Sequence, residues 1–171
     1  MNKKIYFLTL TILFAAGLLL AGCSNDPGEA DNNAADYNYE EDAGQEDIIE
    51  QYSSTDFQEG VTAQALWIAP ELYELAVEEE LVTENELEEN IIFDLWLSTH
   101  SGDLMDFSYE DNVVLSTDNG EISPRNITVI SRDSHHPRIL LKFEKSLIED
   151  TENMELLIKG LRNVPKRAFS W

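Results

Sequence analysis

Short segments with strand character recur along residues 61–171 of this 171-residue chain, and they constrain its fold more than any other feature. In residues 138–145, Ile139, Leu141 and Phe143 occupy every second position, as in a strand with one face in a core. We predict seven strands, over residues 61–68, 89–99, 112–117, 126–132, 138–145, 154–160 and 165–171. Seven short strands separated by turn signals predict a β-sandwich or barrel.

One acidic segment interrupts the strand pattern. Residues 70–81 begin with a proline and carry apolar residues at helical spacing, which predicts a short helix. Thr83 and Glu86 have the spacing of a capping box, so a further helical turn is expected there. We interpret this part as a helical insertion between the first two strands, placed to cover one open end of the sandwich.

The aromatic residues of the strands are expected to fill the core. In residues 89–99, Phe93 shares one face with Leu95 and Leu97, while Trp96 shares the other with Ile92 and Asp94. Large aromatic side chains in strands usually occupy core space. We therefore predict core positions for all three tryptophans, at 67, 96 and 171.

The N-terminus has the pattern of an export signal. Two lysines precede a mostly apolar run over residues 5–20, and small residues then lead to Cys23. The sequence Leu-Ala-Gly-Cys at residues 20–23 resembles the lipobox of bacterial lipoproteins. This resemblance implies that residues 1–22 are removed and that Cys23 carries a diacylglycerol, which anchors the chain to the cell membrane, facing outside the cytoplasm. An uncleaved signal anchor is the alternative.

Residues 23–56 are predicted to form a disordered, acidic linker. They contain no Lys or Arg, few apolar residues and no steady period. Such a tether would hold a folded domain, residues 57–171, away from the membrane surface. A cation-binding tail is the alternative for this segment.

Charge is distributed unevenly along the chain. The net charge is −23, and 28 of the 34 acidic residues precede residue 125, whereas nine of the 11 basic residues follow residue 124. Strong acidity argues against a nucleic-acid partner. The late basic residues either neutralise acidic neighbours across paired strands or form a patch for a wall polymer or an envelope protein.

Several stretches resemble a family of uncharacterised exported bacterial proteins with an immunoglobulin-like β-sandwich. The matching stretches are residues 93–104 (FDLWLSTHSGDL), 112–120 (NVVLSTDNG), 135–143 (HHPRILLKF) and 154–171. The resemblance implies that the seven or so predicted strands form an immunoglobulin-like sandwich outside the cytoplasm, and the acidic helical insertion is larger here than in that family. It implies no activity.

All three histidines lie in two predicted loops. His100 follows the second predicted strand, and His135 and His136 lie between the fourth and fifth. Imidazole is a common ligand for zinc, copper and nickel, so the three residues form a candidate transition-metal site if the loops converge. Simple loop hydrogen bonding is the alternative, and Pro137 favours it because it holds His136 extended.

Acidic loop residues suggest a second kind of ion site. Asp103, Asp106, Glu110 and Asp111 offer the oxygen ligands that calcium uses, but not with the spacing of the helix-loop-helix calcium loop. No cofactor is required by any motif in the sequence.

No motif of an enzyme is found in the sequence, and the lone Cys23 is expected to carry the lipid. We therefore predict a lipid-anchored protein that presents a non-catalytic binding domain. The alternatives are a transition-metal-binding lipoprotein and a structural accessory of an envelope complex that acts through the acidic helix.

Overall fold

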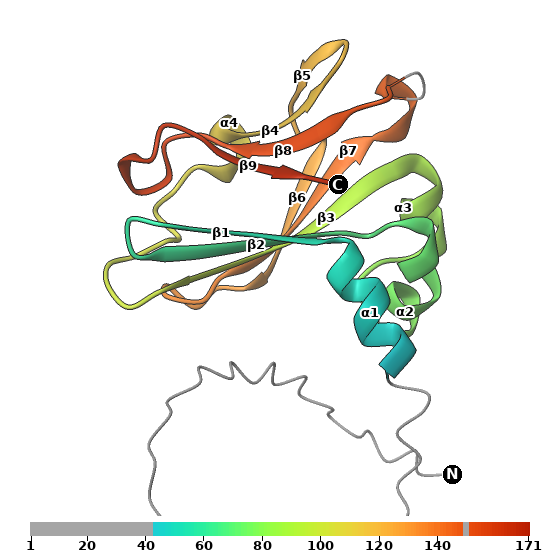
Figure 1. Cartoon of the computed structure of the whole chain (residues 1–171), viewed down its shortest axis with the longest axis horizontal. Coiled ribbons are helices and arrows are strands. Elements are labelled where there is room, and N and C mark those ends of the chain that lie inside the picture. Colours follow the sequence, from blue (N-terminus) through green and yellow to red (C-terminus); the bar gives the residue numbers. More distant parts are fainter. Residues whose placement is uncertain (1–42, 149–150) are drawn as a thin grey trace, which may run out of the picture. The chain divides into compact units, whose positions relative to one another are not determined.

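The computed structural model describes residues 43–148 and 151–171, which form two antiparallel sheets (Figure 1). The first sheet has the order β1-β2-β3-β7-β6. Its strands are β1 (Ser53–Gln58), β2 (Val61–Trp67), β3 (Asn90–Thr99), β7 (Arg138–Glu144) and β6 (Asn126–Ser131). The second sheet has the order β5-β4-β8-β9. Its strands are β5 (Gly120–Ile122), β4 (Val113–Thr117), β8 (Met154–Ile158) and β9 (Arg167–Ser170).

The two sheets share one apolar core, which is the arrangement of a β-sandwich. Phe93, Leu95 and Leu97 of β3 are buried there, as their alternation predicted. Leu156 and Phe169 enter the same core from the second sheet. The prediction of a mainly β fold is therefore confirmed for the described residues, but they form nine strands and not seven, because β1 and β5 were not predicted.

A second apolar cluster lies on the outer face of the five-stranded sheet. The connection from β2 to β3 contains the 3-10 turn η1 (Pro70–Leu72), α2 (Tyr73–Glu78) and α3 (Glu84–Glu89). Leu72 and Leu87 of this connection pack against Ile92 and Leu140, which point outward from the sheet. The helical insertion is thus confirmed, but it covers half of a sheet face and not an open end of the sandwich. Ile92 and Leu140 explain this position, because they offer the helices an apolar surface.

The predicted capping box begins α3. The Thr83 hydroxyl accepts a hydrogen bond from the Glu86 amide at 3.4 Å, and the Glu86 carboxylate accepts one from the Thr83 amide at 3.0 Å. These bonds satisfy two amides at the start of the helix that have no helical partner.

The folded part begins earlier than the expected boundary at residue 57. Helix α1 (Ala43–Gln51) and strand β1 occupy part of the segment expected to be linker. Ile48 and Ile49 are half-buried against the second apolar cluster, and β1 pairs along its whole length with β2. Sequence patterns missed these elements because α1 is acidic and β1 is a polar edge strand.

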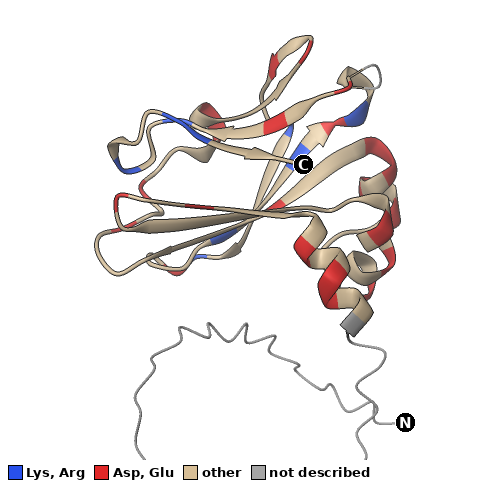
Figure 2. Ribbon diagram, viewed as in Figure 1, with Lys and Arg blue, Asp and Glu red and all other residues tan. Residues whose placement is uncertain are grey.

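The charges follow the division between helices and strands (Figure 2). Acidic residues gather on α1, α2 and α3, which we call the helical end, whereas Lys and Arg lie in other parts of the molecule. Five of the nine basic residues after position 124 pair with acidic residues that precede them: Arg125 with Glu89, Arg138 with Asp94, Lys142 with Glu86, Lys159 with Glu121 and Arg167 with Asp56. Neutralisation across paired strands is therefore confirmed for Arg138 and Asp94, on β7 and β3, whereas the other four pairs join helices, loops or strands that are not paired.

Candidate functional site

Four loops meet at the end of the sandwich opposite the helical end (Figure 1). They are the β1–β2 turn (residues 59–60), the loop after β3 (residues 100–108), the β6–β7 loop (residues 132–137) and the β8–β9 loop (residues 159–166). We call these four loops the loop end. It contains all three histidines, and it is the candidate functional site.

Hydrogen bonds join three of these loops at Thr99, the last residue of β3. The buried Thr99 hydroxyl donates to the Gly60 carbonyl at 3.1 Å, and the Thr99 amide donates to the His135 carbonyl at 3.0 Å. A second bond joins the same two loops, because the Leu104 amide of the loop after β3 donates to the Ser134 carbonyl of the β6–β7 loop at 2.8 Å. The loop after β3 is therefore fixed to both the β1–β2 turn and the β6–β7 loop.

Arg162 fixes the fourth loop to the others. Its guanidinium donates to the Ser101 carbonyl and lies beside Gly102, where any side chain would collide with it. Gly102 also has a φ of +73°, which glycine adopts without strain. The loop after β3 therefore depends on a glycine at this position.

Backbone strain is concentrated at the loop end. The described residues include four non-glycine residues with positive φ, and three of them lie here: Glu59 (47°), Arg162 (54°) and Asn163 (61°). Such conformations cost free energy and persist only where the surroundings enforce them. They often occur at functional sites, so this observation marks the loop end independently of the histidines.

Arg167 closes the corner between the two sheets beneath these loops. Its side chain is fully buried, its Nη2 donates to the Gln58 carbonyl at 2.8 Å, and its Nη1 donates to the Asp56 carboxylate. Strand β9 is thereby bound to the edge strand β1. The charge is compensated, because Asp56 provides the counter-ion.

The two loops that carry the histidines meet, and contacts within the β6–β7 loop hold the backbone of His135 and His136. The amides of His135 and His136 both donate to one Asp133 oxygen, at 2.8 and 2.9 Å, and these bonds lower the pKa of the Asp133 carboxyl. His100, His135 and His136 are all exposed. Among residues 43–148 and 151–171, no three His, Cys, Asp or Glu side chains are grouped so as to hold a metal. The loops converge through Thr99, whereas the transition-metal site stays a prediction.

The acidic residues of the expected calcium site take part in local turns. Asp103 accepts from the Met105 amide at 2.7 Å, and Asp111 accepts from the Ser108 hydroxyl at 2.6 Å. Tyr109 supports this loop from inside, because its buried hydroxyl donates to the Leu104 carbonyl at 2.9 Å. Burial raises the pKa of Tyr109, so the hydroxyl stays protonated as a donor. Asp106 and Glu110 are exposed, and the calcium site also stays a prediction.

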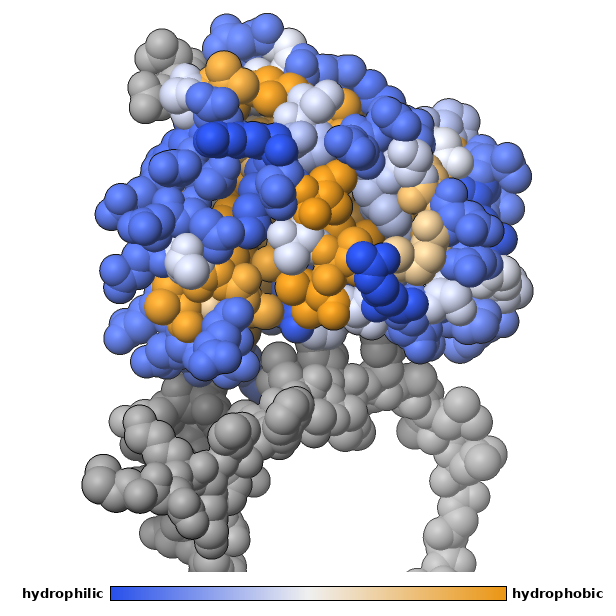
Figure 3. Space-filling view, turned by 180° about the vertical axis from the view of Figure 1, so that it is seen from behind, coloured by the Kyte–Doolittle hydropathy of each residue, from blue (hydrophilic) through white to orange (hydrophobic). Residues whose placement is uncertain are grey.

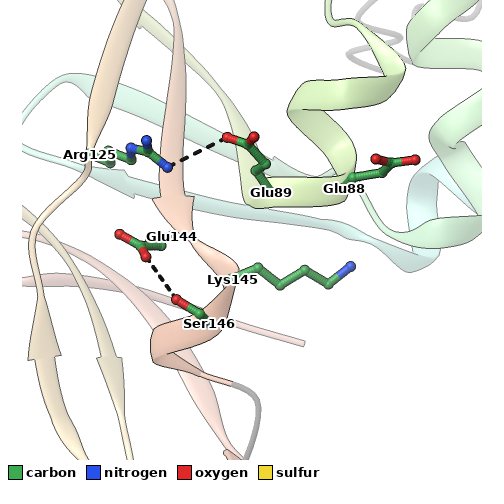
Figure 4. Close-up of a pocket in the computed structure, with 6 residues that line it drawn as sticks. All are labelled: Glu88, Glu89, Arg125, Glu144, Lys145 and Ser146. Atoms are coloured by element: carbon green, nitrogen blue, oxygen red, sulfur yellow. Dashed lines mark hydrogen bonds and ion pairs between the residues drawn. The ribbon is translucent and has the colours of Figure 1, made fainter.

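A polar hollow of about 370 Å³ lies between α3, the start of β6 and the end of β7 (Figure 4). Arg125 and Glu89 face each other across it at 3.6 Å, and Ser146 donates to Glu144 at 2.8 Å. Lys145 extends away from these groups. The Arg125 and Glu89 side chains are 56% and 68% exposed, so their ion pair is weak. It does not fix either side chain in a position for binding a ligand.

The residues of the loop end that matter most were not found by sequence reasoning. Arg162 and Arg167 have no motif, and each reaches a partner more than 60 residues away. Cys23, the predicted signal and residues 23–42 of the predicted tether lie outside the described residues. Within residues 43–148 and 151–171, no helix is long and apolar enough to span a membrane.

Comparison with known proteins gives no relative. No family model, no curated protein and no solved structure matches the chain.

Proposed function

We propose that this protein is a lipid-anchored, extracytoplasmic lipoprotein whose β-sandwich binds an envelope protein non-catalytically through the loop end. The observation that carries the proposal is the concentration of positive-φ residues in loops that hydrogen bonds lock together. Rigid scaffolds that present fixed loops are a common design for binding. The N-terminal pattern around Cys23 supports the location.

The immunoglobulin-like relationship is a proposal about architecture. Two packed antiparallel sheets support it. The adjacency of β1, β2 and β3 in one sheet counts against it, because strands B and C of immunoglobulin domains lie in opposite sheets. An experimental structure that kept this strand order would place the domain outside the immunoglobulin topology.

The lipid anchor is tested by Cys23→Ser. We expect this variant to accumulate as an unprocessed precursor or to leave the membrane fraction, because only the cysteine thiol can receive the lipid. The native protein should fractionate with membranes at mature size. A Cys23→Ser variant that still did so would refute the lipobox interpretation.

The binding surface is tested by site-specific photo-crosslinking in intact membranes. A photoreactive residue at exposed Lys166, in the loop end, should give a defined crosslinked product with an envelope protein. The same residue at exposed Glu79, at the helical end, is the matched control and should give none. Products from position 79 alone would instead support a structural accessory that acts through the acidic helices, and no product from either position would refute a protein partner.

Metal binding is a second candidate function, because the Thr99–His135 hydrogen bond brings the two histidine loops together. Chelated full-length protein would be melted with and without copper, zinc, nickel and calcium, beside His100→Ala. A metal at a hundred times its dissociation constant adds about 2.7 kcal/mol to stability. A histidine-dependent rise supports the site, whereas a rise with calcium alone points to the acidic loops. No rise with any ion refutes both.

A further inference from the structure

The helices cover only half of the outer face of the five-stranded sheet. The other half, which we call the open face, is formed by the outward residues of all five strands. By the sheet register its residues are Thr55, Phe57, Thr62, Gln64, Trp96, Ser98, Thr128, Ser131 and Arg138, and none of them is buried; Ile130 is the unpaired residue of the bulge beside Ser131. Phe57 and Ile130 are 71% and 43% exposed, and they lie on β1 and β6, the two edge strands of the sheet.

Trp96 lies on the open face and not in the core, which corrects the sequence-based expectation. The guanidinium of Arg138 lies over its ring, 4.4 Å from the centroid. Gln64 of β2 and Arg138 of β7 are its direct neighbours in the sheet register. An aromatic ring, a guanidinium and an amide thus stand side by side on three adjacent strands.

The carboxylate of Asp94 holds the Arg138 side chain in place. Its Nε and Nη2 donate to the carboxylate of Asp94, at 3.0 and 2.6 Å, and Asp94 is only 1% exposed. Within the described residues, Nη1 makes no hydrogen bond, and the Arg138 side chain is 25% exposed. Two donors of a guanidinium with fixed orientation are therefore available at the surface.

The open face carries no net charge. Arg138 is the one charged residue in this set, and the carboxylate of Asp94, which lies on the same side of the sheet but is buried, neutralises it. The chain as a whole has a strong negative charge, which repels a polyanion. The open face offers no unpaired cation that would offset this repulsion, because Arg138 is paired with Asp94. Apolar and aromatic surfaces, an amide and fixed donors suit a ligand with apolar C–H faces and many neutral hydroxyls. Apolar faces and neutral hydroxyls together are the chemistry of a sugar chain.

We propose that the open face binds an uncharged glycan strand, with Trp96, Arg138 and Gln64 as the central contacts and Phe57 at one border. Apolar residues also reach the surface in other parts of the molecule, as Figure 3 shows for the side opposite to that of Figure 1. The open face borders the loop end, since Arg138 directly follows the β6–β7 loop, but it is formed by strand residues and not by the loops, so it does not depend on the function proposed above.

The test is calorimetric titration of the full-length protein with two neutral oligosaccharides, chitohexaose and cellohexaose, and with an oligogalacturonate of similar length. The detergent must have no sugar headgroup. We expect at least one neutral oligosaccharide to bind, with an affinity that hardly changes with salt. The double variant Phe57→Ser/Gln64→Ala should weaken it about tenfold, because a stacking surface and a hydrogen bond are lost.

Two control variants distinguish the open face from the rest of the protein surface. Leu147→Ser removes another exposed apolar residue, 53% exposed on a different element, and should leave the affinity unchanged. Lys166→Glu in the loop end should also leave it unchanged. The proposal is overturned if neither neutral oligosaccharide binds, if only the oligogalacturonate binds, or if light scattering shows a dimer that the double variant dissociates, which would assign the face to a second copy of the chain.

Discussion

The helical end and the loop end are stabilised by different forces. At the helical end, apolar side chains of the helices pack against Ile92 and Leu140 of the sheet, and the helices carry their acidic residues outside this cluster. At the loop end, polar contacts from Thr99, Arg162 and Arg167 join the segments. Burial of apolar surface has no preferred direction, whereas hydrogen bonds fix the positions of the groups that they join.

This difference indicates which end is suited to recognition. A surface that binds a partner must hold its groups in place before binding, because ordering them afterwards weakens the affinity. The loop end meets this requirement through hydrogen bonds, and it accepts backbone strain at Glu59, Arg162 and Asn163. At the helical end, α3 is linked to the sheet by Lys142, which pairs with the Glu86 carboxylate and lowers its pKa, and by the Asn90 side chain, which donates to the Glu86 carbonyl at 2.9 Å.

The largest effect is expected from Arg167 at the loop end. Arg167→Ala should reduce the free energy of unfolding by about 4 kcal/mol, because it breaks a buried ion pair and removes a large buried side chain. Urea unfolding of the full-length protein measures this change. Arg167→Met fills the volume but leaves the Gln58 carbonyl without a donor, so a loss of about 2 kcal/mol should remain. A methionine variant as stable as the native protein would show that volume, and not hydrogen bonding, holds this corner.

A smaller effect is expected at the helical end. Leu87→Ala should cost about 3 kcal/mol, because Leu87 is 3% exposed and leaves a cavity in the second apolar cluster. The matched control is Leu147→Ala, which removes an exposed leucine and should cost less than about 0.5 kcal/mol. Equal losses from the two variants would mean that the helices contribute little to the stability of the sheet.

Local patterns were sufficient to predict much of the fold. Strand alternation assigned Phe93, Leu95 and Leu97 to one face of β3, and the spacing of Thr83 and Glu86 predicted the start of α3. Both signals act over a few residues, so neighbours in the sequence carry them. The same alternation could not tell which face of β3 enters the sandwich core, because the helices bury Ile92 on the other face as well.

The candidate site was only partly predictable. The histidines were recognised in the sequence as possible metal ligands, and their loops do meet. The hydrogen bonds that join the loops are made by other residues, Thr99 and Arg162. Arg167 lies more than 100 residues from Gln58, and no local pattern indicates such a pairing. Helix α1 and strand β1 were missed for a related reason, since their stability comes from β2 and the helical cluster and not from their own polar sequences.

The smallest effect concerns the protonation of Asp133 at the loop end. The amides of His135 and His136 lower its pKa, so the carboxylate supports the β6–β7 loop at every pH above the ordinary aspartate range. This support is lost as the pH falls through the lowered folded-state pKa, because the protonated group accepts these bonds less well. The two histidine amide resonances should therefore shift below the ordinary aspartate range, as a nuclear magnetic resonance titration would show. In Asp133→Asn this acidic transition should disappear; an unchanged acidic transition would show that a different carboxyl controls the loop.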